Sequence, residues 1–331
     1  MHNSVSQPDS ITVTVPARLH LGFLDLNGGL GRRFGGMGLA ISDLKTRVTI
    51  SRLPRHNAAV PAGDRARQYL QTMEQALALD GGHDLELTEV VPAHAGLGSG
   101  TQLALAVAAG VRRLHNRPLD VEGDALRLGR GARSGIGIGL FHHGGLVVDG
   151  GRGQAPTPAP IVSRLSFPDQ WRVVVILDPH RRGLSGAEEV TTFADRPPMR
   201  EADAAHICRL ILVKALPAVV EHDLESFGTA IKDLQRMLGD YFASAQGGAR
   251  FTSSAVAEVL ETLDRAGAFG IGQSSWGPTG FAFAPSAQAA EHLAEIVRQH
   301  PSGRHLDIRI CSGLNHGAEI VTHARAHRSG A

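Results

Sequence analysis

The 331-residue sequence has few cysteines, no long apolar run and almost no excess of charge. Cys208 and Cys311 stand far apart and outside any CxxC pattern, which argues against a disulfide scaffold or a zinc ribbon and favours a reducing compartment. No stretch approaches about twenty consecutive apolar residues, so no membrane span is expected. The polar segment 1–10 lacks the basic and apolar regions of a signal peptide. We therefore expect a cytoplasmic protein.

Charge of the two signs is balanced, with 33 Lys and Arg against 32 Asp and Glu. A chain of this kind has no general surface for polyanions, so we expect no nucleic-acid partner and look for local anion sites instead. What the sequence has in plenty is glycine, with 40 residues that cluster in 28–38, 96–100, 129–153 and 267–280. Clustered glycine marks turns where the backbone approaches itself or a ligand closely.

Hydrophobic periodicity predicts strands and helices in both halves of the chain, which is an α+β fold. The predicted strands cover 11–15, 19–23, 46–51, 85–91, 145–148, 172–177, 279–284, 306–311 and 318–322. The predicted helices cover 64–80, 99–116, 203–220, 224–238, 253–266 and 286–299. The segment 27–38 and the proline-rich run 154–160 are predicted to be loops. We place a domain boundary at the end of that run, which gives an N-terminal domain over 1–160 and a C-terminal domain over 161–331.

The strand that ends near residue 91 leads into a glycine-rich turn that opens a helix. The first N–H groups of a helix lack intrahelical partners, and the helix dipole places partial positive charge there. Glycines in the turn remove the side chains that would keep a phosphate away from those N–H groups. Without a ligand, the same turn would be a helix N-cap with Ser99 as the capping residue. Three alternating glycines favour phosphate or pyrophosphate binding by His94, Gly96, Leu97, Gly98, Ser99, Gly100 and Thr101.

The turn has neither the lysine of a P-loop nor the spacing of a dinucleotide fingerprint. It resembles the second motif of the GHMP kinase superfamily, roughly PxxxGLGSSA, which holds the nucleotide triphosphate in those kinases. Residues 16–22, the segment 134–145 and residues 270–283 are similar to the other motifs of the superfamily. The resemblance implies a GHMP-kinase-like two-layer fold, with a ribosomal protein S5 domain 2-like N-terminal part and a ferredoxin-like C-terminal part.

Two departures set this chain apart from the kinases. Gly137 stands where several of them carry a catalytic aspartate, and Gly100-Thr101 replaces the usual Ser-Ala. A phosphoryl transfer built on that carboxylate is therefore not expected. The departures fit one branch of the superfamily, the β-ribofuranosylaminobenzene 5′-phosphate synthases. The matching stretches are 17–23, 94–102, 129–137, 183–186 and 273–278.

This resemblance implies a glycosyltransferase of tetrahydromethanopterin biosynthesis, and thus of one-carbon metabolism. Its substrates would be phosphoribosyl pyrophosphate and either 4-aminobenzoate or 4-hydroxybenzoate, and its by-products carbon dioxide and pyrophosphate. A divalent cation, Mg²⁺, and a homodimer are also expected, and the metal ligands are left open. Two alternatives stay open as well: an ATP-dependent small-molecule kinase, and a non-catalytic sensor of a phosphorylated metabolite.

Such a reaction needs positive groups where pyrophosphate leaves. Arg18, Arg130 and Arg133 lie in or beside glycine-rich segments and are expected to pair with phosphate, whereas Arg32 and Arg33 are either further phosphate ligands or surface charges. Three smaller sets complete the hypothesis. Arg18, His20 and Glu188 are the candidate catalytic residues, and Ser274, Ser275 and Trp276 are candidates for binding the aromatic substrate. Asp25 is either a magnesium or acid–base carboxylate or a surface or capping residue.

Overall fold

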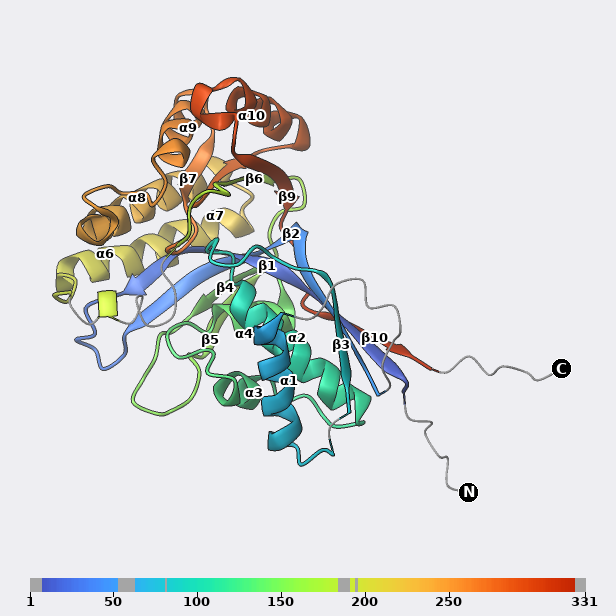
Figure 1. The fold of residues 1–331 in the computed structure, drawn as a ribbon. Helices are drawn as coiled ribbons and strands as arrows, with labels where there is room; N and C mark the ends of the chain where they lie inside the picture. The colour runs from blue at the N-terminus through green and yellow to red at the C-terminus, as the bar shows by residue number, and fades with distance from the viewer. Residues whose placement is uncertain (1–7, 53–62, 81, 184–190, 194–195, 325–331) are drawn as a thin grey trace.

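Two antiparallel sheets organise the chain in the computed structural model, which describes residues 8–52, 63–80, 82–183, 191–193 and 196–324 (Figure 1). The first sheet has six strands in the order β10-β1-β2-β4-β5, with β3 also paired to β2. Its strands are β1 (Ser10–Asp25), β2 (Phe34–Ser51), β3 (Asp84–Glu89), β4 (Leu146–Asp149), β5 (Ile161–Leu165) and β10 (Glu319–His323). The second sheet, in the order β7-β8-β6-β9, comprises β6 (Arg172–Leu177), β7 (Phe269–Gln273), β8 (Thr279–Ala284) and β9 (Asp307–Ser312).

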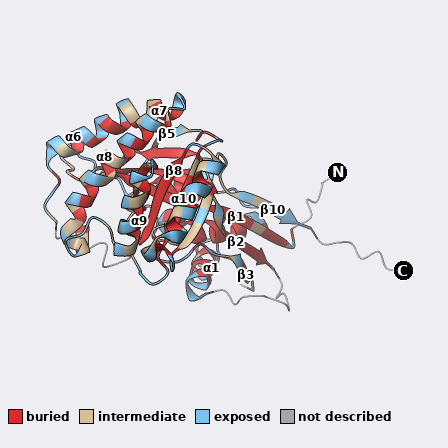
Figure 2. Ribbon diagram, turned by 90° about the horizontal axis from the view of Figure 1, so that it is seen from above, coloured by how far each residue is buried: buried red, intermediate tan, exposed pale blue. Residues whose placement is uncertain are grey.

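Helices cover both sheets. Three helices of the first half lie against the first sheet: α1 (Asp64–Ala76), α2 (Ser99–Leu114) and α4 (Ile136–His143). The short helix α3 (Val121–Arg127) packs on these helices. The second half contributes α6 (Glu201–Leu210), a π-helical turn (Ile211–Ala215), α7 (Leu216–Val220), α8 (Leu224–Phe242), α9 (Ser254–Arg265) and α10 (Ala287–Gln299). Two short 3₁₀ turns follow α8 and α10, at Ala243–Gln246 and Pro301–Gly303. Figure 2 shows buried strands lying between helices whose outer sides are exposed.

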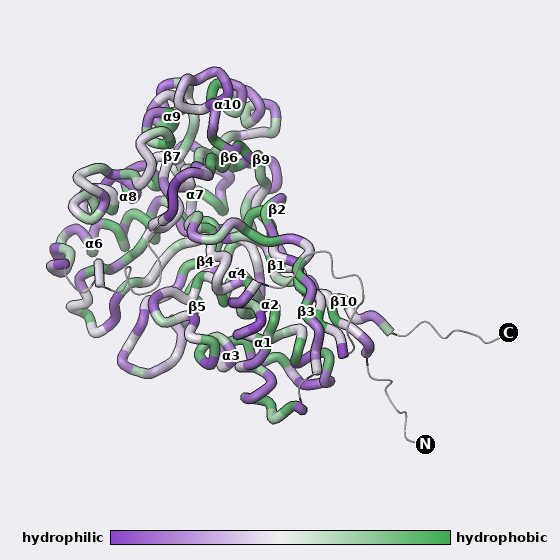
Figure 3. The backbone as a smooth tube through the Cα atoms, viewed as in Figure 1, coloured by the Kyte–Doolittle hydropathy of each residue, from purple (hydrophilic) through white to green (hydrophobic). Residues whose placement is uncertain are grey.

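Strand β6 shows how the layers share one core. Val173 and Val175 point into a cluster that reaches the first sheet, whereas Val174 and Ile176 pack against α9 and α10. A strand that is buried on both faces reads as a continuous apolar run, which is why the sequence predicted it. In Figure 3 the tube is hydrophobic along β6.

The predicted loop over 27–38 is wrong in its second part, because β2 already begins at Phe34. Glycine suggested a turn here, but Gly36 and Gly38 lie within the strand and serve close packing. A Cβ atom on Gly38 would lie 2.3 Å from Cγ2 of Ile136 in α4. Helix α4 was not predicted for the same reason, because its glycines suggested a loop although they serve close packing. A Cβ atom on its Gly139 would lie 2.6 Å from Cδ1 of Ile161 in β5.

The sheets do not divide the chain at residue 160. Strands β5 and β10 both come after that position, yet β5 pairs with β4 and β10 pairs with β1 in the first sheet. The proline-rich run therefore connects two neighbouring strands, and the last strand returns to the N-terminal layer. Within the described ranges, none of the helices combines the length and the apolar character that crossing a membrane requires.

Candidate functional site

A cavity of about 740 Å³ lies between the first turn of α2, strand β1, the loop 129–134 and the turn 275–277. Its volume is typical of sites for small molecules. It is called the arginine cavity below and is lined by Arg18, His20, Phe23, Arg33, Phe34, Arg65, His94, Gly96, Gly98, Ser99, Gly100, Thr101, Gly129, Arg130, Gly131, Ala132, Arg133, Ser134, Arg152, Phe193, Ser275, Trp276 and Gly277. The structure thus brings most of the predicted site residues together.

The charge of this cavity has one sign. Six arginines line it, and no aspartate or glutamate does so among the residues that the structure describes. Since the whole chain is nearly neutral, this concentration of guanidinium groups is local. Arginine pairs with phosphate through two parallel hydrogen bonds, so a cavity of this kind favours a polyanionic ligand.

The glycine turn places the start of α2 inside the cavity. Gly98 is the N-cap residue, with φ of 74°, and no side chain caps the helix, so Ser99 is not the capping residue. A Cβ atom on Gly98 would lie 3.1 Å from Nε of Arg18, and one on Gly100 would lie 3.4 Å from Nη1 of Arg130. Two guanidinium groups therefore lie directly against the helix N-terminus, where the helix dipole adds positive potential.

Gly96 and Leu97 have a structural role. A Cβ atom on Gly96 would lie 2.1 Å from the carbonyl oxygen of Ser274, so this glycine allows two turns to pack backbone to backbone. The Leu97 side chain is buried in the core, and its carbonyl accepts the N–H of Arg18 at 3.0 Å. These contacts hold the turn against β1 and the 274–277 turn.

Ser274 corrects the prediction that it binds the aromatic substrate. Its side chain is fully buried and does not line the arginine cavity. The hydroxyl donates to the carbonyl of Gly96 at 2.8 Å and accepts the N–H of His20 at 3.0 Å. Because both hydrogen-bonding functions are used, Ser274 joins three motifs and does not face a ligand.

His20 and Trp276 are buried polar side chains in the cavity wall. His20 is 2% exposed and Trp276 is 4% exposed. Among the described residues, the two ring nitrogens of His20 have no hydrogen-bond partner, and the indole N–H of Trp276 has none either. Burial, and secondarily the charge of Arg18, lowers the pKa of His20 well below its ordinary value. His20 is therefore neutral at neutral pH.

The loop 129–134, called the arginine loop because it carries Arg130 and Arg133, is fixed at its C-terminal end by Asp149. This carboxylate is fully buried and accepts hydrogen bonds from the Ser134 hydroxyl and the Gly135 and Gly151 N–H groups, each at 2.9 Å. Burial raises the pKa of Asp149 despite these three donors. Within the loop, the Arg130 guanidinium donates to the hydroxyl of Tyr69.

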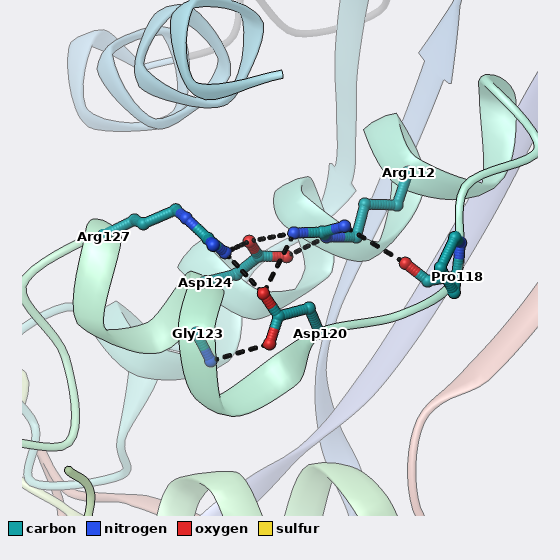
Figure 4. Close-up of polar contacts among 6 residues, drawn as sticks. All are labelled: Arg112, Pro118, Asp120, Gly123, Asp124 and Arg127. Atoms are coloured by element: carbon teal, nitrogen blue, oxygen red, sulfur yellow. Dashed lines mark hydrogen bonds and ion pairs between the residues drawn. The ribbon is translucent and has the colours of Figure 1, made fainter.

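Helix α3 fixes the other end of the arginine loop. Arg112 of α2 donates to Asp124 from Nε at 2.5 Å and from Nη2 at 2.8 Å, and both side chains are almost fully buried (Figure 4). Arg127 adds a second guanidinium on Asp124 at 2.7 Å. This ion-pair network holds α3 on α2 immediately before the loop begins.

Sequence reasoning missed Arg65, Arg152 and Asp149. Arg152 and Asp149 lie in the glycine-dense segment 129–153, which was a usable signal, whereas nothing distinguished Arg65 from a surface charge. Of the two arginines whose role was left open, Arg33 lines the cavity, whereas Arg32 donates to the carbonyls of Gly150 and Gly151 and has a structural role.

Of the two carboxylates with predicted roles, only Asp25 is described, and it does not line the arginine cavity. Asp25 accepts the N–H groups of Asn27 and Gly28 at 2.7 and 2.9 Å, so it caps a turn. Glu188 lies outside the described residues, as does the predicted stretch 184–186. Among the residues that are described, no cluster of three or more His, Cys, Asp and Glu side chains could hold a metal ion.

Comparisons with known proteins agree with this architecture. The model of the GHMP kinases N-terminal domain matches residues 64–145, and that of the GHMP kinases C-terminal domain matches residues 215–303. A β-ribofuranosylphenol 5′-phosphate synthase of Archaeoglobus fulgidus is 35% identical over 94% of this chain and 99% of its own. Its counterpart in Methanocaldococcus jannaschii is 31% identical over 93% of this chain and 99% of its own.

Among solved structures, a homoserine kinase from Cytophaga hutchinsonii has a TM-score of 0.65 at 16% identity, covering 96% of this chain and 98% of its own. At that identity the likeness concerns the fold alone. Together with the matched domains, it confirms the α+β, GHMP-kinase-like fold that the motifs predicted.

Proposed function

The chain belongs to the family of the β-ribofuranosylphenol 5′-phosphate synthases and is an enzyme of that type, and we propose that it joins phosphoribosyl pyrophosphate to a 4-substituted benzoate. In this proposal pyrophosphate and carbon dioxide are released and a carbon–carbon bond forms between ribose and ring. The product would enter tetrahydromethanopterin biosynthesis. One observation carries the proposal: six arginines and a helix N-terminus surround one cavity, without a carboxylate among its described lining residues.

The chemistry of the first step explains the need for this positive charge. Pyrophosphate leaves the anomeric carbon through an oxocarbenium-like transition state, and its oxygens gain negative charge as the bond lengthens. Donors that are already in place stabilise that charge without reorganisation. Arg18 and Arg130, which lie against the α2 N-terminus, are the proposed contacts of the leaving group, and Arg133 on the same loop is a further one.

The other wall of the cavity is suited to an aromatic ring. Trp276 and Phe193 pack edge to face with ring centroids 5.5 Å apart, and both line the cavity. The carboxylate of the benzoate would face the arginines, since the ring carbon that bears it is the one that attacks the ribose. The names of the relatives describe a ribosylated phenol, which 4-hydroxybenzoate would yield, so we propose it as the substrate ahead of 4-aminobenzoate.

The proposed Mg²⁺ would arrive largely as part of the substrate. Magnesium in phosphate sites is held by substrate oxygens, water and one or two protein ligands. Among the described lining residues, the hydroxyls of Ser99, Thr101, Ser134 and Ser275 are the uncharged side-chain oxygens that fit this role, and no carboxylate is present. The ion would add positive charge on the leaving pyrophosphate.

The kinase alternative is less compatible with the site. A Cβ atom on Gly137 would lie 2.8 Å from Cγ2 of Thr101, so the Thr101 side chain fills the space into which a catalytic aspartate would extend. The two departures from the kinase pattern, Gly137 and Thr101, are therefore neighbours in space, and the threonine side chain requires the glycine. Two incubations distinguish a kinase from a synthase. A kinase would form ADP from ATP and an alcohol, whereas a synthase would release pyrophosphate and carbon dioxide from phosphoribosyl pyrophosphate and 4-hydroxybenzoate.

The variant Arg18→Ala tests the role of the anion site in this function. Loss of turnover, or of affinity for phosphoribosyl pyrophosphate, by about tenfold or more is expected, because a charged hydrogen bond to the leaving group contributes about 1.5–3 kcal/mol. Wild-type kinetic constants in this variant would count against the proposed role of Arg18.

A further inference from the structure

A second, smaller cavity of about 30 Å³ adjoins the arginine cavity. Four residues line both cavities: His20, Phe23, Ser275 and Trp276. The remaining walls are formed by Gly22, Gln235, Leu238, Gly239, Phe242, Gln246, Arg250 and Gln273. A volume of this size holds about one or two groups as large as a water molecule, which excludes a whole aromatic ring.

The polar groups of the small cavity fall into two kinds. Those on the far side are already paired. The Gln273 amide nitrogen donates to Gln246 at 3.0 Å, its oxygen accepts the N–H of Thr252 at 2.6 Å, and Arg250 forms an ion pair with Asp240 at 2.5 Å.

The groups at the boundary with the arginine cavity are not paired. His20 and Trp276 are both more than nine-tenths buried, and their ring nitrogens have no partner among the described residues. Buried polar atoms in proteins are normally hydrogen-bonded, so an unpaired set in a cavity wall indicates a ligand with complementary groups. The aromatic rings of Phe23 and Phe242 complete this part of the wall.

The reaction proposed above sets the direction of the ring, and the inference rests on that function. The carbon that bears the carboxylate must meet the ribose, which is held with its pyrophosphate at the arginine wall. The substituent at position 4 is on the opposite end of the ring and points away from the arginines. The small cavity adjoins His20 and Trp276, none of the six arginines of the arginine cavity lines it, and it has room for one hydroxyl or amino group.

We infer that the small cavity is the subsite for the 4-hydroxyl or 4-amino group of the benzoate, and that His20 hydrogen-bonds this group and takes and returns its proton during the reaction. Trp276 donates its N–H to the same substituent or packs on the ring edge. This gives the enzyme a specificity element that is separate from its anion site.

The proton transfer balances over the two steps. As the ring carbon attacks the ribose, the ring electrons form the new carbon–carbon bond and the sugar–oxygen bond breaks, with its electron pair leaving on pyrophosphate. The ring becomes a cation whose charge is shared by the 4-oxygen, and that oxygen passes its proton to His20. The resulting dienone then loses carbon dioxide, the electron pair of the broken bond restores aromaticity, and the phenolate oxygen recovers the proton from His20.

A neutral and weakly basic imidazole suits both transfers. The hydroxyl of the cationic ring is a far stronger acid than a phenol, so a weak base is sufficient to accept its proton. The phenolate that is left after decarboxylation is a much stronger base than the buried imidazole, so the proton returns readily. Burial and the neighbouring Arg18 keep His20 in the neutral form that this cycle requires.

Binding of unreactive probes tests the subsite without turnover. The full chain, saturated with inorganic pyrophosphate, is titrated by calorimetry with benzoate, 4-hydroxybenzoate and 4-propoxybenzoate. The wild type is expected to bind 4-hydroxybenzoate about tenfold more tightly than benzoate, as one buried hydrogen bond allows, and to reject the propoxy compound for its size. Equal affinities for all three probes would overturn the inference.

The variants His20→Leu and His20→Gln separate the two roles of the histidine. His20→Leu is expected to lose both the tenfold preference and turnover. His20→Gln can still hydrogen-bond the hydroxyl but cannot carry its proton, so it keeps most of the preference and loses turnover by about 10²–10⁴-fold. His206→Leu, a change at an exposed histidine on α6, is the matched control and should alter neither. Thermal unfolding shows whether each variant is folded. If His20→Leu does not fold, the test is made with His20→Gln.

The outcomes distinguish this inference from the function on which it rests. A wild type that releases no carbon dioxide, but prefers 4-hydroxybenzoate through His20, would contradict the proposed reaction and keep the subsite. A wild type that releases carbon dioxide, while His20→Leu and His20→Gln retain both preference and rate, would keep the reaction and overturn the subsite.

Discussion

The glycines of the phosphate turn differ from one another in what they do. Gly96 lies against the backbone of Ser274, whereas Gly98 and Gly100 leave room for two guanidinium groups beside the start of α2. A glycine pattern in a sequence does not separate these roles, because both require the absence of a Cβ atom. The three-dimensional contacts assign packing to the first glycine and ligand access to the other two.

Replacing Gly98 by valine should weaken binding of phosphoribosyl pyrophosphate by tenfold or more. The new side chain would push against Arg18 from 3.1 Å and would have to adopt a left-handed conformation at φ of 74°. The strain alone costs about 1–2 kcal/mol of stability. Gly267→Val is the matched control, since it has φ of 88° and no atom within 4 Å, and it should lose stability but keep the affinity measured by calorimetry.

Restoring an aspartate at position 137 should not restore a kinase. Gly137→Asp would place its Cβ 2.8 Å from the Thr101 methyl group, so the single variant is expected to unfold at a lower temperature and to release no ADP. Adding Thr101→Ala removes the clash, and the double variant should regain most of the lost stability. Additive stability changes in this double-mutant cycle would show that the two positions are not coupled.

At the scale of elements, the arginine loop is held at both ends by buried acids. Asp124 fixes α3 through Arg112, and Asp149 fixes the residues that follow the loop. Neither contact was predicted, because hydrophobic period and glycine clustering carry no information on which buried carboxylate meets which donor. The sequence did offer Arg130 and Arg133 of this glycine-rich loop as candidate phosphate ligands, and both line the cavity.

The two acids of the α3 network should differ in their effect on stability. Asp124→Ala leaves the Arg112 guanidinium, which is 8% exposed, without its main partner and should cost about 3–5 kcal/mol. Asp120 is 41% exposed and caps α3 through the N–H of Gly123, so Asp120→Ala should cost about 1–2 kcal/mol. Urea unfolding measures both, and equal losses would contradict the assigned role of burial.

Asp149 should affect both stability and substrate affinity. Asp149→Ala leaves three buried donors unpaired and is expected to cost about 1–3 kcal/mol, and to raise KM for phosphoribosyl pyrophosphate more than it changes kcat. Lys232, which pairs with Asp264 on the surface, gives a control in Lys232→Ala with unchanged KM.

The pH dependence of Asp149 has a defined sign. Its pKa is raised above 3.8 by burial, so the folded protein binds the proton more tightly than the unfolded chain. Its contribution to the free energy of unfolding should therefore increase as pH falls through the folded pKa towards 3.8 and decrease as pH rises again. Asp149→Asn should lack this part of the pH dependence in urea unfolding, whereas an unchanged profile would contradict the raised pKa.

At the scale of the whole molecule, much of the architecture could be predicted and the site only in outline. Helix α8 was predicted from its helical period and strand β6 from its continuous apolar run, because both patterns are local in the sequence. The pairing of β5 and β10 with the first sheet could not be predicted, since contacts between distant strands leave no local pattern. The convergence of Arg65 and Arg152 on the cavity depends on that same long-range packing.

The homodimer and the identity of the metal ion stay predictions at this scale.

Binding of phosphoribosyl pyrophosphate should raise the unfolding temperature, because a ligand at 100 times its Kd adds about 2.7 kcal/mol to the stability of the folded state. Arg18→Ala should reduce that shift under the same conditions.

The most direct test of the central claim is a product assay on the wild-type chain with phosphoribosyl pyrophosphate and 4-hydroxybenzoate. A cavity with six arginines at a helix N-terminus should release pyrophosphate and carbon dioxide in equal amounts, with a ribosylated phenol as the third product. Formation of ADP and a phosphorylated alcohol from ATP, with no carbon dioxide from the first mixture, would contradict it.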